Sequence, residues 1–327
     1  FDISIHLENY HCNEEAKYFL LSFLKEYKIA AVVVTYNRLR LLKECLKRVL
    51  AQTVGCDVLI INNASTDGTE EWLRANDSER VFFRCSSHNL GGAGGFNAGL
   101  RWAVEAGYEY IWLMDDDCFP QNDALEKLVE AACALDGDFG WISSTALWID
   151  GSPCRMNRQK PYAHFCGKSG KIGLRRAEQA TFVSLFIKTD TVAEYGLPIS
   201  DFFIWGDDIE YTRRIAVRGK LPGYVADEST VIHAMSSNAG SDISKAPAGQ
   251  LHRYVYAFRN EAYLYRQEGF AGILYYAAKC IWNFIKILLF ANDSKRKRIL
   301  VLAEGIRKGF AFDPPAENLG STDETVF

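Results

Sequence analysis

Three consecutive carboxylates, Asp115, Asp116 and Asp117, follow a short apolar run at positions 110–114. The run is rich in aromatic and branched side chains, and it therefore predicts a buried strand that ends at the acidic residues. Three adjacent like charges repel one another, and a cation between them would relieve this repulsion. Carboxylate oxygens are the ligands that magnesium and manganese prefer. A solvated acidic turn is the alternative, because one acidic run does not provide a complete ligand set.

A second acidic pair, Asp207 and Asp208, follows the aromatic stretch 202–205 and begins a predicted helix. Carboxylates in the first turn of a helix stabilise it by capping and through the helix dipole, which requires no other role. The capping role does not explain the large aromatic residues beside them. A carboxylate next to Trp205 at the edge of a cleft would be partly desolvated and could act as a general base, and an aromatic face can carry a sugar ring.

Two further features of the sequence indicate a function only in combination with other residues. His233 follows a β-branched run; a single histidine is usually structural, and it becomes a metal-ligand candidate only if it meets the acidic triplet in space. The glycines Gly91, Gly92, Gly94 and Gly95 precede a helix expected to begin near residue 96. Such a loop could offer backbone N–H groups to a diphosphate, or it could be a flexible turn. It matches neither the dinucleotide-binding nor the P-loop motif.

The elements that must position these residues alternate between strands and helices. Continuous apolar runs at 29–34 and 57–61 predict central parallel strands, and an amphipathic helix is expected between them. Thr35, Asn37 and Arg38 follow the first strand, where polar groups are well placed to bind a ligand. The sequence predicts an α/β fold in which helices cover both faces of a mostly parallel sheet.

Two segments after the acidic triplet are expected to differ in structure. Residues 150–176 contain glycine, proline and basic residues but few periodic apolar ones, which favours a loop insertion over the sheet. Residues 179–188 return to strand character. A strand is therefore expected only after the insertion.

Composition limits the class of protein. The chain has 327 residues, of which 48% are hydrophobic and 24% charged, so it can bury a large core. A net charge of -4 argues against a surface adapted as a whole to nucleic acid, and no nucleic-acid partner is expected. The nine cysteines lack zinc-site spacing and suit a reducing compartment.

Five segments in this order resemble the family-2 glycosyltransferases of GT-A fold, especially the bacterial galactofuranosyltransferases and their rhamnosyltransferase relatives. They are VVVTYNR, IINNASTDGT, NLGGAGGFNAG, WLMDDD and WGDDIEY, and the resemblance spans about residues 29–265. It implies an inverting, metal-dependent hexosyltransferase that uses Mn²⁺ or Mg²⁺. The implied reaction moves galactofuranose from UDP-galactofuranose to a glycan or lipid-linked acceptor in bacterial surface polysaccharide synthesis. A rhamnosyltransferase using dTDP-rhamnose is one alternative, and a catalytically silent sugar-nucleotide-binding protein is another.

The resemblance also implies roles for individual residues. Asp115, Asp117 and His233 match metal-binding positions, Asp208 matches the catalytic base, and Asp207 and Trp205 match the acceptor side. The implied donor-binding residues are Thr35, Asn37, Arg38, Asn63, Asn89, Gly91, Gly92, Asp115 and Asp116. One position departs from the pattern: many relatives bind uracil with an acidic pair where this chain has Asn62 and Asn63. The amide donors and acceptors differ from those of carboxylates, which leaves the choice of nucleotide open.

The chain divides into four expected regions. These are an N-terminal extension with a short helix (1–28), the catalytic domain (29–248), a helical region (249–312) and a flexible tail (313–327). The start lacks the features of a secretory signal, which suggests a cytoplasmic protein. The helical region contains an apolar stretch of about 20 residues, interrupted by Lys279, Asn283 and Lys286. This pattern indicates an amphipathic helix, either packed on the domain or lying on the inner face of the cell membrane.

Overall fold

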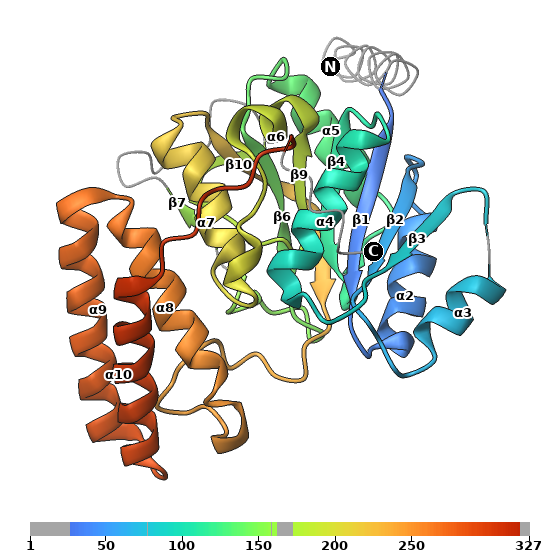
Figure 1. Cartoon of the computed structure of the whole chain (residues 1–327). Coiled ribbons are helices and arrows are strands. Elements are labelled where there is room, and N and C mark those ends of the chain that lie inside the picture. Colours follow the sequence, from blue (N-terminus) through green and yellow to red (C-terminus); the bar gives the residue numbers. More distant parts are fainter. Residues whose placement is uncertain (1–26, 77, 158, 162–172, 321–327) are drawn as a thin grey trace, which may run out of the picture.

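The computed structural model describes residues 27–76, 78–157, 159–161 and 173–320. A single mixed sheet runs through the centre with the strand order β3-β2-β1-β4-β9-β6-β10-β8-β7, and β5 pairs with β10 (Figure 1). The strands are β1 Ile29–Thr35, β2 Asp57–Asn62, β3 Val81–Cys85, β4 Tyr110–Asp115, β5 Cys118–Pro120, β6 Trp141–Leu147, β7 Lys160–Pro161, β8 Leu174–Gln179, β9 Leu185–Lys188 and β10 Gly223–His233.

Helices cover the sheet, and three more form a bundle at the C-terminal end (Figure 1). Their bounds are α2 Leu39–Leu50, α3 Thr69–Ala75, α4 Gly91–Glu105, α5 Ala124–Ala134, α6 Thr189–Tyr195, α7 Asp207–Arg213, α8 Arg253–Arg266, α9 Gly269–Phe290 and α10 Lys295–Ala311. Strands β3, β2, β1 and β4 are parallel, whereas β9 runs antiparallel to both β4 and β6. The expected α/β fold is confirmed, with parallel pairing in its N-terminal half and mixed pairing beyond β4.

Strand β1 shows why its sequence is continuously apolar. All seven residues are buried, and successive side chains point to opposite faces of the sheet. Ala31 and Val33 join a core that includes residues of α2 and α5, whereas Val32 and Val34 join the core beneath α4. Because both faces are covered, β1 has no polar face, and its polar residues come only at its carboxyl end.

The glycine-rich segment is helical, so the expected helix start near residue 96 is wrong. Helix α4 begins at Gly91 and packs closely on β1. A Cβ atom on Gly95 would lie 2.5 Å from Val34 Cγ1, and one on Gly99 would lie 2.4 Å from Val32 Cγ1. Gly95 and Gly99 therefore serve helix-to-sheet packing, which local sequence cannot distinguish from loop flexibility.

The region after β6 also differs from the expectation. Strand β8 begins at Leu174, inside the segment expected to be a loop, and pairs antiparallel with β10. The strand expected at 179–188 is limited to β9, which begins at Leu185. Phe182 and Val183 are buried although they lie outside any strand. Their apolar side chains contribute to the core in a turn, and they imitate strand residues in the sequence.

The structure describes only part of each end of the chain. The helix expected in the extension 1–28 falls almost wholly on residues 1–26, outside the described part. The tail was expected to be flexible, but residues 313–320 pack on the catalytic domain: the N–H of Leu197 donates to the carbonyl of Glu317 at 2.8 Å, and Arg101 donates to the carbonyl of Leu319 at 2.9 Å. Residues 321–327 lie outside the described residues.

Candidate active site

The acidic triplet lies where two strands meet. Strand β4 ends at Asp115, a turn through Asp116 and Asp117 follows, and β5 then pairs antiparallel with β10. In this pairing Cys118 lies opposite His233, the last residue of β10. The sheet therefore brings together carboxylates and an imidazole that are more than a hundred positions apart in the sequence.

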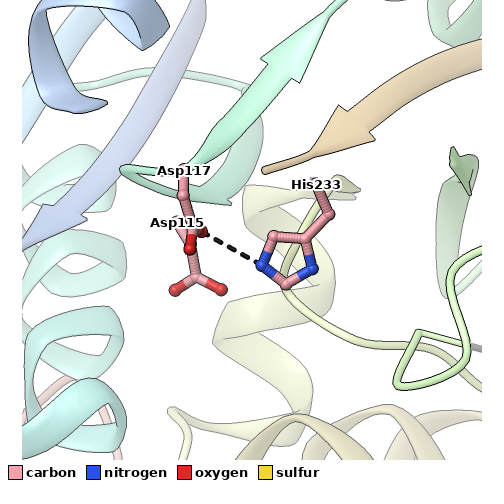
Figure 2. A group of neighbouring side chains, drawn as sticks. All are labelled: Asp115, Asp117 and His233. Carbon is pink, nitrogen blue, oxygen red and sulfur yellow. Dashed lines mark ion pairs between the residues drawn. The ribbon is translucent and has the colours of Figure 1, made fainter. Parts of the chain in front are cut away.

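Asp115, Asp117 and His233 form a cluster whose ligand atoms all lie within 4.8 Å of one another. Figure 2 shows the imidazole pointing towards the two carboxylates. Asp117 Oδ1 lies 3.0 Å from His233 Nε2, yet this buried oxygen has no partner with hydrogen-bond geometry among the described residues. A buried carboxylate oxygen in this state fits a site for a cation. Two carboxylates and one imidazole could hold a divalent metal ion.

Asn157 orients the histidine. His233 Nδ1 lies 2.7 Å from Asn157 Oδ1, and because an amide oxygen only accepts hydrogen bonds, Nδ1 carries the proton. Nε2 then faces Asp117 and is free to act as a ligand, which is the usual arrangement at metal sites. Asn157 was not identified from the sequence, where a single asparagine in a polar loop gives no signal.

Burial and neighbouring charges shift the pKa values of the acidic triplet and of His233. Burial raises the pKa of Asp115 to about 7, and the charge of Asp117 adds to this effect. Burial also raises the pKa of Asp116 to about 6, although Arg38 opposes the shift. Burial would lower the pKa of His233, but Asp117 and the neighbouring groups raise it to about 10. Without a metal, a proton on the histidine therefore takes the place of the positive charge that the carboxylates require.

The residues at the carboxyl end of β1 lie beside this cluster. Thr35 Oγ1 donates to Asp116 Oδ2 at 2.7 Å, and Arg38 Nη1 lies 2.7 Å from Asp117 Oδ2. Asn37 has a left-handed backbone with φ 53°, and its side-chain oxygen accepts the N–H of Thr66 at 2.6 Å. Thr35 and Arg38 therefore contact the acidic triplet directly, whereas Asn37 joins the loops after β1 and β2.

The other expected donor residues line the loop before α4. Asn63 Oδ1 accepts the N–H of Leu90 at 2.8 Å, and its Nδ2 donates to the carbonyl of Gly91 at 2.8 Å. Asn89 Oδ1 accepts the N–H of Gly91 at 2.8 Å. A Cβ atom on Gly92 would meet nothing within 4 Å. The side chain of Asn63 thus fixes this loop, while the space beside Gly92 is open.

A strained turn carries the second acidic pair. Phe203 and Trp205 both have left-handed backbones, with φ 62° and 65°, and Gly206 follows with φ 88°. Such backbones are costly for large side chains and need support from their surroundings. Asn260 of α8 provides it: Nδ2 of this buried residue lies 3.0, 3.1 and 2.7 Å from the carbonyls of residues 202, 204 and 205. Asn260 was not identified from the sequence, because it lies in a long helix far from the turn along the chain.

Asp207 and Asp208 begin helix α7 directly after this turn. Burial raises the pKa of Asp207 to about 8, and the charge of Asp208 adds to it. Burial also raises the pKa of Asp208 to about 7; the N–H of Ile209, which donates to Asp208 Oδ1 at 2.7 Å, opposes this shift, and the charge of Asp115 increases it. Within the described part of the chain, neither carboxylate has a basic partner within ion-pair distance. Asp208 therefore lies within electrostatic reach of the acidic triplet and is poised to exchange a proton near neutral pH.

Trp205 lies between the turn and the helical bundle. Its ring is 5.1 Å from that of Tyr254 in an edge-to-face arrangement, and Arg253 lies 5.9 Å from the centre of the ring. The side chain is partly buried. Its expected contact with an acceptor sugar is thus limited to the part of the ring that the bundle leaves open.

The sequence of this chain resembles those of known proteins. Residues 30–146 match the family model described as glycosyl transferase family 2. Galactofuranosyltransferase GlfT1 of Mycobacterium tuberculosis is 28% identical over 270 residues, which cover 75% of this chain and 84% of the relative. The dTDP-rhamnosyl transferase RfbF of Shigella flexneri is 25% identical over 302 residues, covering 85% and 95% of the two chains.

The fold is also found among solved structures. Mannosyltransferase PcManGT from Pyrobaculum calidifontis, in complex with GDP-Man and Mn²⁺, superposes with a TM-score of 0.53 at 17% identity and covers 96% of this chain and 87% of that chain. This likeness shows the GT-A fold, and the family match together with the sequence relatives identifies the chain as a glycosyltransferase with a family 2 domain at residues 30–146.

Proposed function

We propose that this glycosyltransferase moves galactofuranose from UDP-galactofuranose, with inversion, to a glycan or lipid-linked acceptor in bacterial surface polysaccharide synthesis. The observation that carries the proposal is the cluster of Asp115, Asp117 and His233 within electrostatic reach of Asp208. The likeness to GlfT1 over most of both chains supports galactofuranose as the sugar.

The donor would bind at the carboxyl ends of β1 and β4, where ligands of open α/β sheets usually lie. Asp115, Asp117 and His233 would hold Mn²⁺ or Mg²⁺, and the bound ion would offset the negative charge that develops on the departing nucleotide diphosphate. Arg38 pairs with Asp116 and Asp117, is half exposed, and would hold these carboxylates in place beside the donor. Thr35, Asn37, Asn63, Asn89, Gly91 and Gly92 complete the proposed donor side.

The acceptor would approach from the side of the strained turn. Its hydroxyl oxygen forms a bond to the anomeric carbon while the bond from that carbon to the diphosphate oxygen breaks. The hydroxyl proton passes to Asp208, and the nucleotide diphosphate leaves with the electron pair. Attack from the face opposite the leaving group inverts the anomeric centre. Asp207 and Trp205 would orient the acceptor, since proximity and alignment supply much of the rate.

A donor panel with mass-resolved products tests this proposal. Purified protein would be given UDP-galactofuranose, UDP-galactose or dTDP-rhamnose together with candidate glycan acceptors, with Mn²⁺, with Mg²⁺ or with chelator. We expect a mass increase of one hexose from UDP-galactofuranose, only with a divalent ion. Full turnover in excess chelator, or the absence of transfer from every donor, would contradict the proposal.

A rhamnosyltransferase is the second candidate, and one local feature favours it. Asn62 and Asn63 replace the acidic pair that the resemblance associates with uracil, and the likeness to RfbF covers nearly the whole of that relative. Transfer of a deoxyhexose from dTDP-rhamnose in the same panel, with no hexose transfer, would establish this alternative.

The enzyme would work at the cytoplasmic face of the membrane, lying on it through α9. This helix is long and apolar enough to cross a bilayer by length and composition. However, Lys279 pairs with Glu261 of α8 at 2.5 Å, and Lys286 pairs with Asp242 at 3.3 Å, so the polar side of α9 is held against the protein. The opposite side exposes Phe270, Leu274, Ile281, Trp282, Ile285, Leu289 and other large apolar residues.

The charge beside this apolar face favours an anionic bilayer surface. Lys295, Arg296 and Lys297 are exposed at the start of α10, immediately after α9. Apolar burial combined with attraction to acidic headgroups is typical of helices that lie in the interface. We expect co-sedimentation with phosphatidylglycerol vesicles and much weaker binding to phosphatidylcholine vesicles; a stable dimer that ignores both vesicles would mean that a second copy covers α9 instead.

A further inference from the structure

A groove runs along the seam between α8 and α10, which lie side by side in the C-terminal bundle (Figure 1). Its cavity has a volume of about 380 Å³. The polar groups that line it are His252, Tyr256 and Arg259 on one wall and Lys297, Glu304 and Lys308 on the other. No role proposed above for the donor, the metal or the base uses this groove.

The groove carries an excess of positive charge. Lys308 pairs with Glu304 at 2.8 Å, which accounts for the one carboxylate among the lining residues. Among the described residues, no carboxylate lies within ion-pair distance of Lys297 or Arg259. These two cations therefore lack a carboxylate partner; Arg259 also donates to Asn260 Oδ1 at 2.9 Å and lies over the ring of Phe312 at 3.9 Å, contacts that hold its position but leave its charge uncompensated. An anion in the groove would offset this charge.

The walls of the groove touch the turn that carries the proposed base. The guanidinium of Arg259 donates to the carbonyls of Asp201 and Phe202 at 2.6 and 3.1 Å. The ring of Tyr256 lies 5.3 Å from that of Phe203, two residues before Trp205. A ligand in the groove would therefore lie beside the acceptor side of the turn.

We propose that this groove binds the phosphate or diphosphate group that joins the acceptor glycan to its lipid carrier. The inference rests on the lipid-linked acceptor proposed above. Sugar hydroxyls are neutral and need no uncompensated cations, whereas guanidinium and ammonium groups bind phosphate oxygens strongly. With the phosphate in the groove, the lipid can reach the membrane along the bundle that also carries the apolar face of α9, and the sugar can reach the turn of Trp205 and Asp208.

The test compares two variants of α10 that remove the same charge. Lys297→Ala removes from the groove an ammonium group that has no carboxylate partner among the described residues. Arg307→Ala removes an exposed basic side chain of the same helix that neither lines the groove nor belongs to the basic start of α10. Both leave the turn, the metal cluster and Arg259 untouched. Thermal unfolding of the two variants should match that of the wild type, because both side chains are exposed.

Two water-soluble acceptors with the same glycan distinguish the group that is recognised. One carries an octyl diphosphate, and the other carries a neutral octyl ether. In the groove variant, the KM for the diphosphate acceptor should rise by about ten- to a hundredfold at unchanged kcat, because a charge-assisted contact is lost. The KM for the neutral acceptor should not change, and the control variant should behave as the wild type. Equal KM values for both acceptors in the wild type, or equal losses in both variants, would overturn the proposal.

A binding measurement separates this inference from the proposed function. Octyl diphosphate titrated into metal-free protein without donor should bind to the wild type and the control variant, but not to the groove variant, even if no transfer is detected with any acceptor. A membrane headgroup is the other source of phosphate. If both soluble acceptors keep their KM values in the groove variant, the acceptor assignment is wrong, and a loss of binding to phosphatidylglycerol vesicles then assigns Lys297 to a membrane headgroup.

Discussion

The two acidic clusters of this protein differ in what surrounds them. Asp115, Asp116 and Asp117 lie at the end of a parallel strand, with Arg38, Thr35 and His233 as partners. Asp207 and Asp208 begin a helix after a strained aromatic turn, and no basic side chain of the described residues pairs with them. The acidic triplet is built around a site for positive charge, whereas the acidic pair is left to bind protons.

This difference separates two roles that look alike in sequence. Burial raises the pKa of Asp115 and of Asp208 to about 7 in the metal-free protein. At the triplet, a cation bound by the three ligands would lower the pKa of Asp115 again. At the pair, no such ligand set exists among the described residues, and the raised pKa is useful to a general base. The surroundings, more than the carboxylates, determine the chemistry.

The largest effect is expected from Asp117→Ala. The substitution removes a ligand and the partner of both His233 and Arg38, so transfer should fall by about 10³-fold or more, and added Mn²⁺ should no longer stimulate it. Initial rates across a Mn²⁺ titration measure this effect, and circular dichroism checks the fold. A variant that is still stimulated by Mn²⁺ as strongly as the wild type would remove the distinction between the two clusters.

Asp208→Asn should have the next largest effect. Loss of a base should lower kcat by roughly 10² to 10⁴ while donor binding is kept. Because a base works in its ionised form, wild-type kcat should rise with pH and level off at or below about pH 7, since a bound cation lowers the pKa of Asp208, and this limb should vanish in the variant. Asp207→Asn is the matched control and should mainly raise the acceptor KM. If Asp207→Asn abolishes turnover and Asp208→Asn does not, the two roles are reversed.

Asn260→Leu tests whether the strained turn positions the pair. Loss of the bonds to three carbonyls should let the turn relax, so kcat should fall by about tenfold while metal-dependent donor binding is unchanged. Asn283→Leu is the control, because this buried amide bonds only to the carbonyl of Lys279 in its own helix. Equal loss of activity in the two variants would mean that the effect is one of general stability.

The smallest effect concerns stability and pH. The pKa of Asp207 is raised to about 8 in the folded protein from an ordinary value of 3.8, so the folded state binds this proton more tightly than the unfolded state. The stabilisation of the folded protein by this bound proton is fully present below about pH 4 and is lost as the pH rises to about 8. Asp207→Asn cannot ionise, so its Tm relative to the wild type should increase between about pH 5 and pH 8 by about 2 to 4 °C or more. A pH-independent difference would show that Asp207 is not buried as described.

Local patterns predicted the parts of this molecule that depend on neighbours in sequence. Strands β1 and β4 are continuous apolar runs because both faces of the sheet are covered, and the polar residues that follow them lie where they were expected. The triplet and His233 meet as the resemblance implied.

Features that depend on distant contacts could not be predicted. The glycines of α4 pack on Val32 and Val34 of β1, which no local pattern indicates. Strand β9 enters the sheet between β4 and β6, and this pairing is set by tertiary packing. Asn157 and Asn260 were missed because each acts through a partner far away in the chain. Sequence thus predicted candidate groups for the chemistry but gave no indication of the residues that hold them.

Metal-dependent donor binding, measured by calorimetry in Asp117→Ala and Asp208→Asn side by side, tests the division between the two clusters most directly. With UDP-galactofuranose and Mn²⁺, Asp208→Asn should bind the donor within about threefold of the wild-type affinity, because a base contributes to the transition state and not to donor binding. Asp117→Ala should show no gain in affinity when Mn²⁺ is added. The account would be contradicted if Asp208→Asn lost the Mn²⁺-dependent gain or if Asp117→Ala retained it.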